Sequence, residues 1–312
     1  MILSTTTCVL DKKFGQEKAI EIIARAGFDA VDLSLCDMRD DKNIFNGEDY
    51  IDVAKSQVNV AKRYGIRFNQ AHAYFPSSFN DEEKTRLAFK KIIRGIEIAS
   101  VVGAKIIVVH PMQHLYYPEG KNPEILKEMN FKFYKSLIPY CEKYGISIAI
   151  ENMWQRSKVN NVIIDSTCSC GPEFCEYVDM IGSEWMTACL DLGHCGLVGL
   201  LPQNMIRELG HDRLGALHVH DNNGRDDNHV EPMAPFVSTI DWEEVCKALA
   251  EINYKGDFTF EAEQTFKNAN EYTVDAFTKS LHDIGRYLLS RIEYYKMLNE
   301  ENKKYRNVQS GS

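Results

Sequence analysis

A repeated pattern along the chain constrains its fold more than any other feature. Segments with the periodicity of amphipathic helices end at a glycine, and a short run rich in β-branched residues follows each glycine. These glycines are Gly27, Gly65, Gly103 and Gly145. Glycine commonly follows the last residue of a helix, and β-branched runs are typical of strands. The pattern therefore predicts alternating helices and strands, the organisation of an α/β protein with a parallel sheet.

Eight largely apolar runs are predicted to be strands that are covered on both faces. They are residues 2–8, 30–35, 66–71, 105–110, 147–151, 187–191, 215–220 and 258–262. Eight such strands with helical segments between them, and no linker between two halves, predict a single (β/α)8 TIM barrel. A long helical run over 271–303 predicts an extended C-terminal helix. We assign the barrel to residues 1–303 and expect a mobile tail at 304–312.

An open doubly wound sheet is the competing α/β fold. Such a fold often carries a glycine-rich phosphate-binding turn after its first strand. Here Cys8 leads towards Asp11-Lys12-Lys13 without such a turn. The length of 312 residues allows two domains, but one barrel of about 250 residues with extensions fits it equally well. We therefore favour the single barrel.

Charge and cysteine content restrict the partners and the compartment. The chain has 36 Lys+Arg and 45 Asp+Glu, a net charge of −9, which argues against a nucleic-acid partner. Its apolar runs are too short to cross a bilayer, and its start lacks the basic region of a signal peptide. The 9 scattered cysteines are an odd number and favour reduced thiols. We expect a cytoplasmic protein without a membrane partner.

Six consecutive predicted strands end in residues that can bind a metal. In chain order these residues are His72, His110, Glu151, Asp191 with His194, His218 with His220 and Asp221, and Glu261 with Glu263. In a (β/α)8 barrel the carboxyl ends of the strands surround one mouth, where active sites lie. The sequence therefore predicts that these side chains meet.

The number of these side chains favours a metal centre. A single histidine after a strand is usually only a hydrogen-bonded residue. Five or more carboxylates and imidazoles in one partly dry cavity would instead repel one another and lose hydration at a high cost. A divalent cation removes that cost, and this mixture of oxygen and nitrogen ligands suits Mn²⁺, Mg²⁺, Co²⁺ or Zn²⁺.

The loops at the predicted mouth offer further groups. Asp227 and His229 form a D-x-H element that can chelate a second metal, with a solvated polar loop as the alternative. Arg225 is a candidate anchor for a substrate oxygen or phosphate, with an exposed loop arginine as the alternative. Trp154 and other aromatic residues of these loops can form an apolar wall over a sugar ring.

Three segments carry a resemblance to known proteins. They are Cys189-Leu-Asp-Leu-Gly-His194, Ala216-Leu-His-Val-His-Asp-Asn222 and Thr239-Ile-Asp-Trp242. With them the chain resembles the xylose isomerase-like superfamily of TIM barrels over nearly its whole length. That superfamily includes sugar isomerases, ketose 3-epimerases, inosose dehydratases and endonuclease IV. The nearest similarity is to bacterial sugar phosphate isomerase/epimerase-like proteins.

The resemblance implies a metal-ligand set. Ketose 3-epimerases hold one Mn²⁺ or Co²⁺ with side chains that follow strands 5 to 8. The matching residues here are Glu151, Asp191, His218 and Glu261. We expect one divalent ion, Mn²⁺ first, with Co²⁺, Mg²⁺ or Zn²⁺ as alternatives. His218 is preferred because it begins an H-x-x-D pattern, but His220 has the same inward parity and is the alternative ligand.

The resemblance also implies substrate contacts. The histidine three residues after the strand-6 aspartate binds a substrate oxygen in the epimerases, and here it is His194. Arg225 lies one residue away from the position of the arginine that those enzymes carry. We further expect His72, His110 and Trp154 to contact the substrate.

Endonuclease IV uses a larger ligand set for three zinc ions. Residues of matching type occur here at His72, His110, Glu151, Asp191, His194, His218, Asp227, His229 and Glu261. The chain lacks that enzyme's basic DNA-binding loops, however, and departs from its glycine-rich pattern after His229. A multi-zinc phosphodiesterase is therefore an alternative, and a second or third metal stays open.

The function implied by the resemblance is a metal-dependent sugar isomerase or epimerase. It acts by proton abstraction next to a carbonyl, through a metal-stabilised enediolate. Glu151 and Glu261 are expected to remove and return the proton from opposite sides of the substrate. The same site with a leaving group at the β-carbon gives a lyase or dehydratase acting on a polyol or a C-glycoside-type derivative. We expect a carbohydrate substrate and a homo-oligomer, dimer or tetramer.

Overall fold

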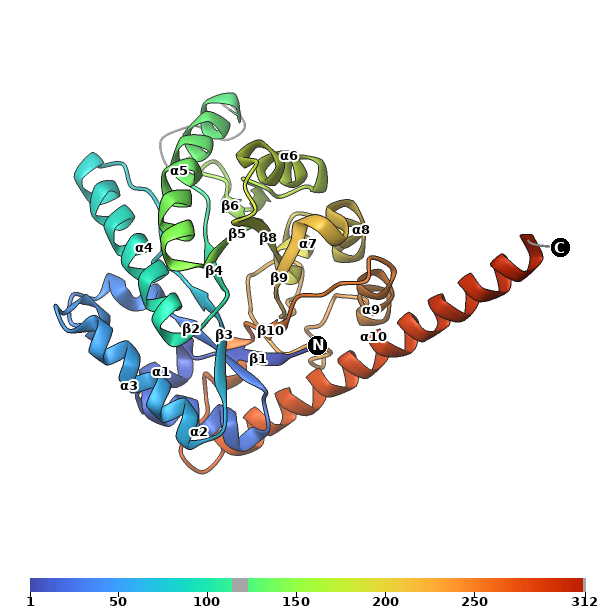
Figure 1. Cartoon of the computed structure of the whole chain (residues 1–312), viewed down its shortest axis with the longest axis horizontal. Helices are drawn as coiled ribbons and strands as arrows, with labels where there is room; N and C mark the ends of the chain where they lie inside the picture. The colour runs from blue at the N-terminus through green and yellow to red at the C-terminus, as the bar shows by residue number, and fades with distance from the viewer. Residues whose placement is uncertain (114–122, 311–312) are drawn as a thin grey trace.

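The barrel predicted from the sequence is confirmed. The computed structural model describes residues 1–113 and 123–310. Eight parallel strands form one sheet in the order β10-β1-β2-β3-β4-β5-β8-β9. An isolated parallel bridge between Val219 and Phe260 joins the two edge strands of that order. The sheet therefore closes into a barrel, and helices surround it (Figure 1).

The barrel strands lie where the apolar runs predict them, and most are shorter by a few residues. They are β1 (Leu3–Thr6), β2 (Ala30–Ser34), β3 (Arg67–His72), β4 (Ile106–Val109), β5 (Ser147–Glu151), β8 (Met186–Asp191), β9 (Leu214–His218) and β10 (Phe258–Phe260). The first predicted strand is wrong at its end, because Cys8 already begins helix α1 (Cys8–Phe14). The backbone N–H of Asp11 donates to the carbonyl of Thr7 at 2.8 Å and closes the first helical turn.

The longer helices include the four that the sequence predicts before Gly27, Gly65, Gly103 and Gly145. They are α2 (Gln16–Ala26), α3 (Tyr50–Arg63), α4 (Glu82–Val102), α5 (Pro123–Tyr144), α6 (Gly171–Ile181), α8 (Pro202–Arg213) and α9 (Trp242–Glu251). Helices α2 and α4 end at Gly27 and Gly103, whose φ values of 99° and 84° favour glycine because it has no Cβ. Asp241 caps α9 by accepting a hydrogen bond from the backbone of Glu244. Local capping thus fixes where the predicted helices begin and end.

The hydrophobic core has two parts. The larger part lies between the strands and the surrounding helices. The smaller part fills the barrel interior with Val108, Ala149, Cys189 and Ala216, which are all buried. These strands therefore have apolar side chains on both faces, as the predicted double coverage requires. The polar strand ends lie beyond this packed interior.

Two features extend beyond the predicted pattern. An antiparallel hairpin, β6 (Trp154–Arg156) and β7 (Ile163–Asp165), forms within the segment that follows β5. The expected C-terminal helix is α10 (Val274–Ser310), and its end projects away from the barrel (Figure 1). It includes most of the tail predicted at 304–312, of which residues 311–312 lie outside the described residues. Mobility of that tail stays a prediction.

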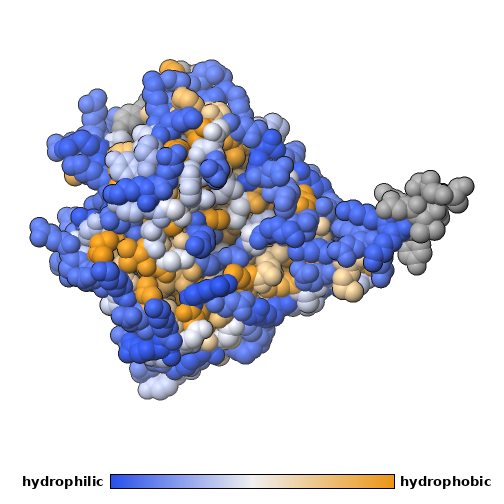
Figure 2. Space-filling model, viewed as in Figure 1, coloured by the Kyte–Doolittle hydropathy of each residue, from blue (hydrophilic) through white to orange (hydrophobic). Residues whose placement is uncertain are grey.

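The surface was also inspected for apolar regions and for membrane-spanning helices. Most of the face in Figure 2 is hydrophilic, and apolar side chains gather only in limited patches. Among the described residues, no helix combines the length and the apolar character that a membrane span requires.

Candidate metal centre

The polar residues at the strand ends converge on one mouth of the barrel. His72, Glu151, Asp191 and His218 are the last residues of β3, β5, β8 and β9. His110 and Glu261 directly follow β4 and β10. All except His110 are buried, and its side chain is only 11% exposed. The prediction that these side chains meet is therefore correct for the described structure.

The first cluster contains the four residues that the resemblance implies as metal ligands. They are Glu151, Asp191, His218 and Glu261, with one ligand atom from each within 4.8 Å of the others. Nδ1 of His218 lies 3.3 Å from Glu151 and 3.1 Å from Glu261. Three carboxylates and one imidazole thus face one point with little access to water.

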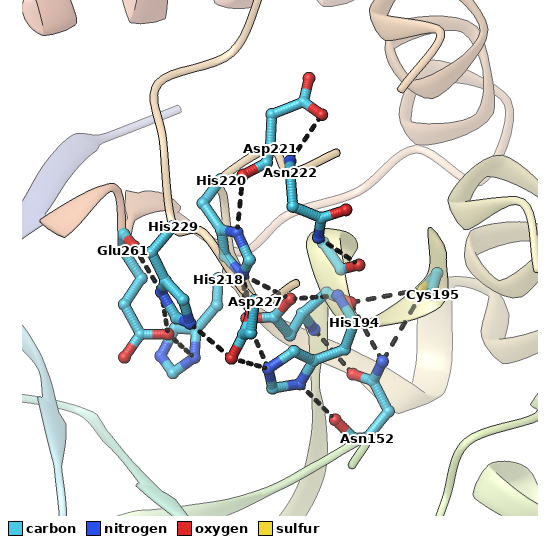
Figure 3. A network of polar contacts seen from close by, with 12 residues as sticks. Asn152, His194, Cys195, His218, His220, Asp221, Asn222, Asp227, His229 and Glu261 are labelled. Atoms are coloured by element: carbon cyan, nitrogen blue, oxygen red, sulfur yellow. Dashed lines mark hydrogen bonds and ion pairs between the residues drawn. The ribbon is translucent and has the colours of Figure 1, made fainter. Parts of the chain in front are cut away.

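The second cluster contains His220 and not His218, so each of the two histidines lies in a group that could hold a metal ion. His220 lies with His194, Asp227 and His229, again with ligand atoms within 4.8 Å (Figure 3). Oδ2 of Asp227 lies 3.0 Å from Nε2 of His229 and 3.5 Å from Nε2 of His194. His218 and His220 therefore face different clusters, although they are only two residues apart.

A third group overlaps the first. Nε2 of His110 lies 3.0 Å from Nε2 of His72 and 3.0 Å from Oε2 of Glu151. Two imidazole nitrogens at this distance need a shared proton or a cation between them. Glu151 thus belongs to two of the groups that could hold an ion.

Backbone carbonyls fix the orientation of the histidines. In four histidines, Nδ1 lies 2.8–3.3 Å from a backbone carbonyl oxygen. The pairs of histidine and carbonyl residue are His72 with Ala73, His194 with Asn152, His220 with Asp221, and His229 with Glu261. A carbonyl can only accept, so each Nδ1–H donates. The neutral ring then presents the lone pair of Nε2 to its cluster, which is the tautomer that metal-ligating histidines use. Figure 3 shows this arrangement for the second cluster.

Electrostatic coupling in the site is strong. Burial alone would raise the pKa of Glu151, but His110 and His218 beside it hold that pKa well below its usual range. Burial alone would lower the pKa of His194, but Asp191 and Asp227 raise it to about 10. The carboxylates and imidazoles of the site therefore stabilise one another's charged forms, and a divalent cation would supply the positive charge instead.

A cavity of about 440 Å³ opens onto the clusters. Its wall includes Phe75, His110, Gln113, Glu151, Met153, Trp154, Gln155, Arg156, Lys158, His194, Asp227, His229 and Glu261. Trp154, His110 and His194, which we expected to contact substrate, therefore line this cavity. His72 lies behind them and is buried. A volume of this size accommodates a small molecule such as a monosaccharide.

Arg225 is not brought into the cavity. Arg225 is exposed in the loop after β9, and its backbone N–H donates to the side-chain oxygen of Asn223. The cationic residues on the cavity wall are instead Arg156 and Lys158, which belong to or follow strand β6. The same segment presents Trp154, whose indole N–H donates to Asp227 at 3.3 Å.

One buried carboxylate holds the loop that carries Asp227 and His229. Asp221 accepts hydrogen bonds from the indole of Trp242 at 2.7 Å and from the backbone of Thr239 at 2.9 Å. Two segments that carry the resemblance noted in the sequence, the H-x-x-D pattern and Thr239-Ile-Asp-Trp242, therefore meet. Their contact fixes both ends of the ligand-bearing loop.

Sequence reasoning missed two polar residues near the clusters. Asp32 on β2 is fully buried, and neither carboxylate oxygen has a hydrogen-bond partner among the described residues. Burial raises its pKa to about 6. Cys36 places its sulfur 3.0 Å from Nδ1 of His72. The charged residue in an otherwise apolar predicted strand was the available signal for Asp32, while no local pattern pairs Cys36 with His72.

Comparison with known proteins agrees with the observed barrel. The family model for xylose isomerase-like TIM barrels matches residues 20–278. The chain belongs to this family. An uncharacterized protein of Methanocaldococcus jannaschii is 30% identical over 274 residues, which are 81% of this chain and 84% of that protein.

Solved structures of this xylose isomerase-like fold resemble the chain along most of its length. A D-tagatose 3-epimerase-like protein has a TM-score of 0.70 at 24% identity, over 94% of this chain and 99% of its own. The IolI protein, whose structure contains a zinc atom, has a TM-score of 0.69 at 15% identity, over 95% and 99% of the two chains. Other structural neighbours are sugar epimerases. At these identities the similarity establishes the fold.

Proposed function

We propose that the protein is a divalent-metal-dependent sugar isomerase or epimerase. The observation that carries the proposal is the buried cluster of Glu151, Asp191, His218 and Glu261 at the base of a cavity of monosaccharide size. The fold is shared with sugar epimerases, which supports the same class of substrate. Mn²⁺ is the ion that we expect, with Co²⁺, Mg²⁺ or Zn²⁺ as alternatives.

The donor atoms of the first cluster fit a divalent cation. Oε2 of Glu151 and both ring nitrogens of His218 are buried and form no hydrogen bond among the described residues, although Oε2 and Nδ1 have ionisable neighbours at 3.0–3.3 Å. Buried polar atoms without hydrogen bonds are costly, and a cation coordinated by these atoms would remove that cost. The oxygen-rich donor set is the kind that Mn²⁺ and Mg²⁺ use, and the imidazole extends it to Co²⁺ and Zn²⁺.

The two glutamates are placed for proton transfer. They lie at the ends of β5 and β10, which are not neighbours in the barrel, so their carboxylates reach the cavity from different sides. One takes the proton from the carbon next to a carbonyl, and the other returns a proton to the opposite face or to the neighbouring carbon. When bound, a divalent cation polarises the carbonyl and stabilises the enediolate.

Other cavity residues position the sugar. His194 donates its Nδ1–H to Asn152, so Nε2 faces the cavity and contacts a substrate oxygen. The indole of Trp154 supplies an apolar wall for the sugar ring. We assign His110 to a hydroxyl of the substrate, and His72 to support of His110 from behind.

Hydrogen exchange tests this proposal. Metal-loaded protein is incubated with a panel of ketoses and inososes in deuterated water, and mass spectrometry follows both deuterium uptake and product mass. We expect deuterium to replace hydrogen on the carbon next to the carbonyl. Apart from this exchange, the product should be an isomer of the substrate. Glu151→Gln and Glu261→Gln should abolish the exchange, whereas Glu173→Gln on α6, outside the cavity wall, should retain it. A product lighter by one water would establish a lyase instead.

A multi-metal phosphodiesterase is the second candidate function. The observation that favours it is the presence of overlapping groups around Glu151 and Asp191, which could hold more than one ion. Metal clusters of this kind stabilise both the attacking and the leaving oxygen in phosphoryl transfer. Elemental analysis that finds two or three zinc ions per chain, together with nicking of duplex DNA at an abasic site, would establish this function. One ion and no nicking would favour the sugar enzyme.

A further inference from the structure

The wall of the cavity carries charges of both signs. Its acidic residues, Glu151, Asp227 and Glu261, belong to the metal clusters. Its arginine and lysine residues within the described part of the chain are Arg156 and Lys158, which belong to the segment of the β6–β7 hairpin and lie outside those clusters. Two full positive charges beside a substrate cavity favour a ligand that carries a negative charge.

Strand β6 directs Arg156 to the same side as Trp154. Alternate residues of a strand face one side and lie about 7 Å apart along it. Cζ of Arg156 accordingly lies 5.7 Å from the centroid of the Trp154 ring. The indole N–H of Trp154 donates to Asp227 at 3.3 Å, so the same indole contacts both the second cluster and the guanidinium. A sugar ring packed on Trp154 therefore has one end near the clusters and the other near Arg156.

The guanidinium of Arg156 is held in position and keeps capacity for a ligand. One Nη atom donates to the carbonyl of Asn161 in the same hairpin at 3.0 Å, and the other lies 3.2 Å from Oδ1 of Asp226. The side chains of Arg156 and Asp226 are 39% and 57% exposed. Exposed ion pairs contribute little to stability, and a guanidinium has five N–H donors. An anionic group of a ligand can therefore replace the Asp226 carboxylate at a small cost.

We propose that the substrate carries an anionic group, a phosphate or a carboxylate, at the end remote from its reacting carbonyl, and that Arg156 binds this group. The inference rests on the proposed sugar isomerase or epimerase function and specifies its substrate class. A planar guanidinium matches two oxygens of a phosphate or a carboxylate, whereas the ammonium group of Lys158 adds a point charge to the same wall. Arg156 is then a residue that determines specificity.

A bracing role for Arg156 is the alternative. In that role the arginine only joins the hairpin to the loop after β9, through Asp226. The two roles predict opposite effects of Asp226→Asn. If Arg156 only braces the loop, Asp226→Asn and Arg156→Gln impair the same property. If Arg156 binds the substrate anion, Asp226→Asn removes a competing carboxylate and strengthens anion binding.

The experiment compares matched substrates on the metal-loaded, full-length protein. D-fructose, D-tagatose and D-psicose are each tested as the free sugar, the 6-phosphate and the 6-carboxylate. Calorimetry gives Kd, and the rate of deuterium exchange gives kcat and KM. We expect an anionic form to bind more tightly than the free sugar, and the tighter of the two anionic forms identifies the group. Arg156→Gln should raise Kd and KM of that form by about 10- to 100-fold, the worth of a hydrogen bond to a charged group, and leave those of the free sugar unchanged.

Further variants separate anion binding from structural effects. Asp226→Asn should lower the Kd of the anionic form, and Lys158→Gln should raise it. Arg156→Lys should restore part of the affinity that Arg156→Gln loses, because it keeps the charge without the planar fork. Arg213→Gln removes an exposed ion pair with Asp179 outside the cavity wall and should leave the Kd of every form unchanged.

The outcomes distinguish this proposal from the proposed function. Equal Kd values for the free and anionic forms, or an Arg156→Gln variant that weakens both alike, would overturn the anion site and leave the sugar enzyme intact. Weaker anion binding in Asp226→Asn would establish the bracing role instead. Tight binding of an anionic form that depends on Arg156, without deuterium exchange from any of the sugars, would support the anion site and count against the isomerase or epimerase.

Discussion

The carboxylate of Asp191 lies 2.9 Å from Nε2 of His220, and this contact joins two candidate metal clusters. Asp191 belongs to the first cluster, whereas His220 belongs to the second. The same carboxylate accepts a hydrogen bond at 2.8 Å from the backbone N–H of His194, which lies in the first turn of helix α7 (Leu192–Leu197). One side chain therefore caps a helix and fixes the spacing of the two clusters.

Replacement of Asp191 and of His220 should have different effects on metal content. Asp191→Asn removes a ligand of the first cluster and the partner of His220, so we expect metal affinity to fall by more than about 100-fold. His220→Gln should leave the ion of the first cluster bound and affect only the second. Elemental analysis and Co²⁺ titration measure both effects. Equal metal loss in the two variants would contradict this assignment, and Asp226→Asn in the exposed loop serves as a control.

Gly193→Ala should displace His220 without directly altering the first cluster. A Cβ at Gly193 would lie 2.1 Å from the ring of His220, which is fully buried. We expect a loss of about 1–3 kcal/mol in unfolding free energy from this overlap. We also expect a weaker second cluster, visible as a changed Co²⁺ absorption spectrum. Gly196→Ala in the same helix is the matched control, because its Cβ would meet nothing closer than 3.9 Å. Identical spectra for both variants would contradict the prediction.

The barrel and the polar residues at the carboxyl ends of its strands could be predicted from the sequence, because both depend on local patterns. Helix periodicity, the terminal glycines and the polar strand ends are each visible within a few residues. How the polar residues divide into groups was not predictable, because His218 and His220 share inward parity along the chain. Only the closed barrel shows that His218 faces Glu261 whereas His220 faces Asp227. The β6–β7 hairpin was missed because its short strands carry no distinct periodicity.

Metal binding should release protons. Burial lowers the pKa of both rings, but Asp191 and Asp227 raise that of His194 to about 10, and Cys189, Glu261 and Glu151 raise that of His218 well above its ordinary value. The shifts therefore favour the protonated form of each ring. A metal ion needs the neutral ring, so its binding must displace protons and its apparent affinity should rise with pH. Calorimetry of Mn²⁺ binding in buffers of different ionisation enthalpy measures the number released. Binding heats that do not depend on the buffer would contradict this expectation.

Asp11 should reduce the stability of the protein at neutral and alkaline pH. Burial, with Asp37 nearby, raises the pKa of Asp11 to about 7. Its Oδ1 atom has no hydrogen-bond partner among the described residues. The folded chain then binds more protons than the unfolded chain between about pH 4 and pH 7, so unfolding free energy falls as pH rises through that range. Above pH 7 both states carry the charged carboxylate, and the penalty is constant.

Asp11→Asn removes the charge and should therefore stabilise the protein in a pH-dependent way. We expect a gain in unfolding free energy on the order of 1–3 kcal/mol at pH 8, because one pKa unit corresponds to about 1.4 kcal/mol. The gain should shrink as pH falls towards 4. Urea unfolding at pH 5 and pH 8, with metal content held constant, measures the difference. Asp212→Asn, an exposed aspartate at the end of α8, should show no such trend. An equal gain at both pH values would mean that Asp11→Asn acts through packing rather than through charge.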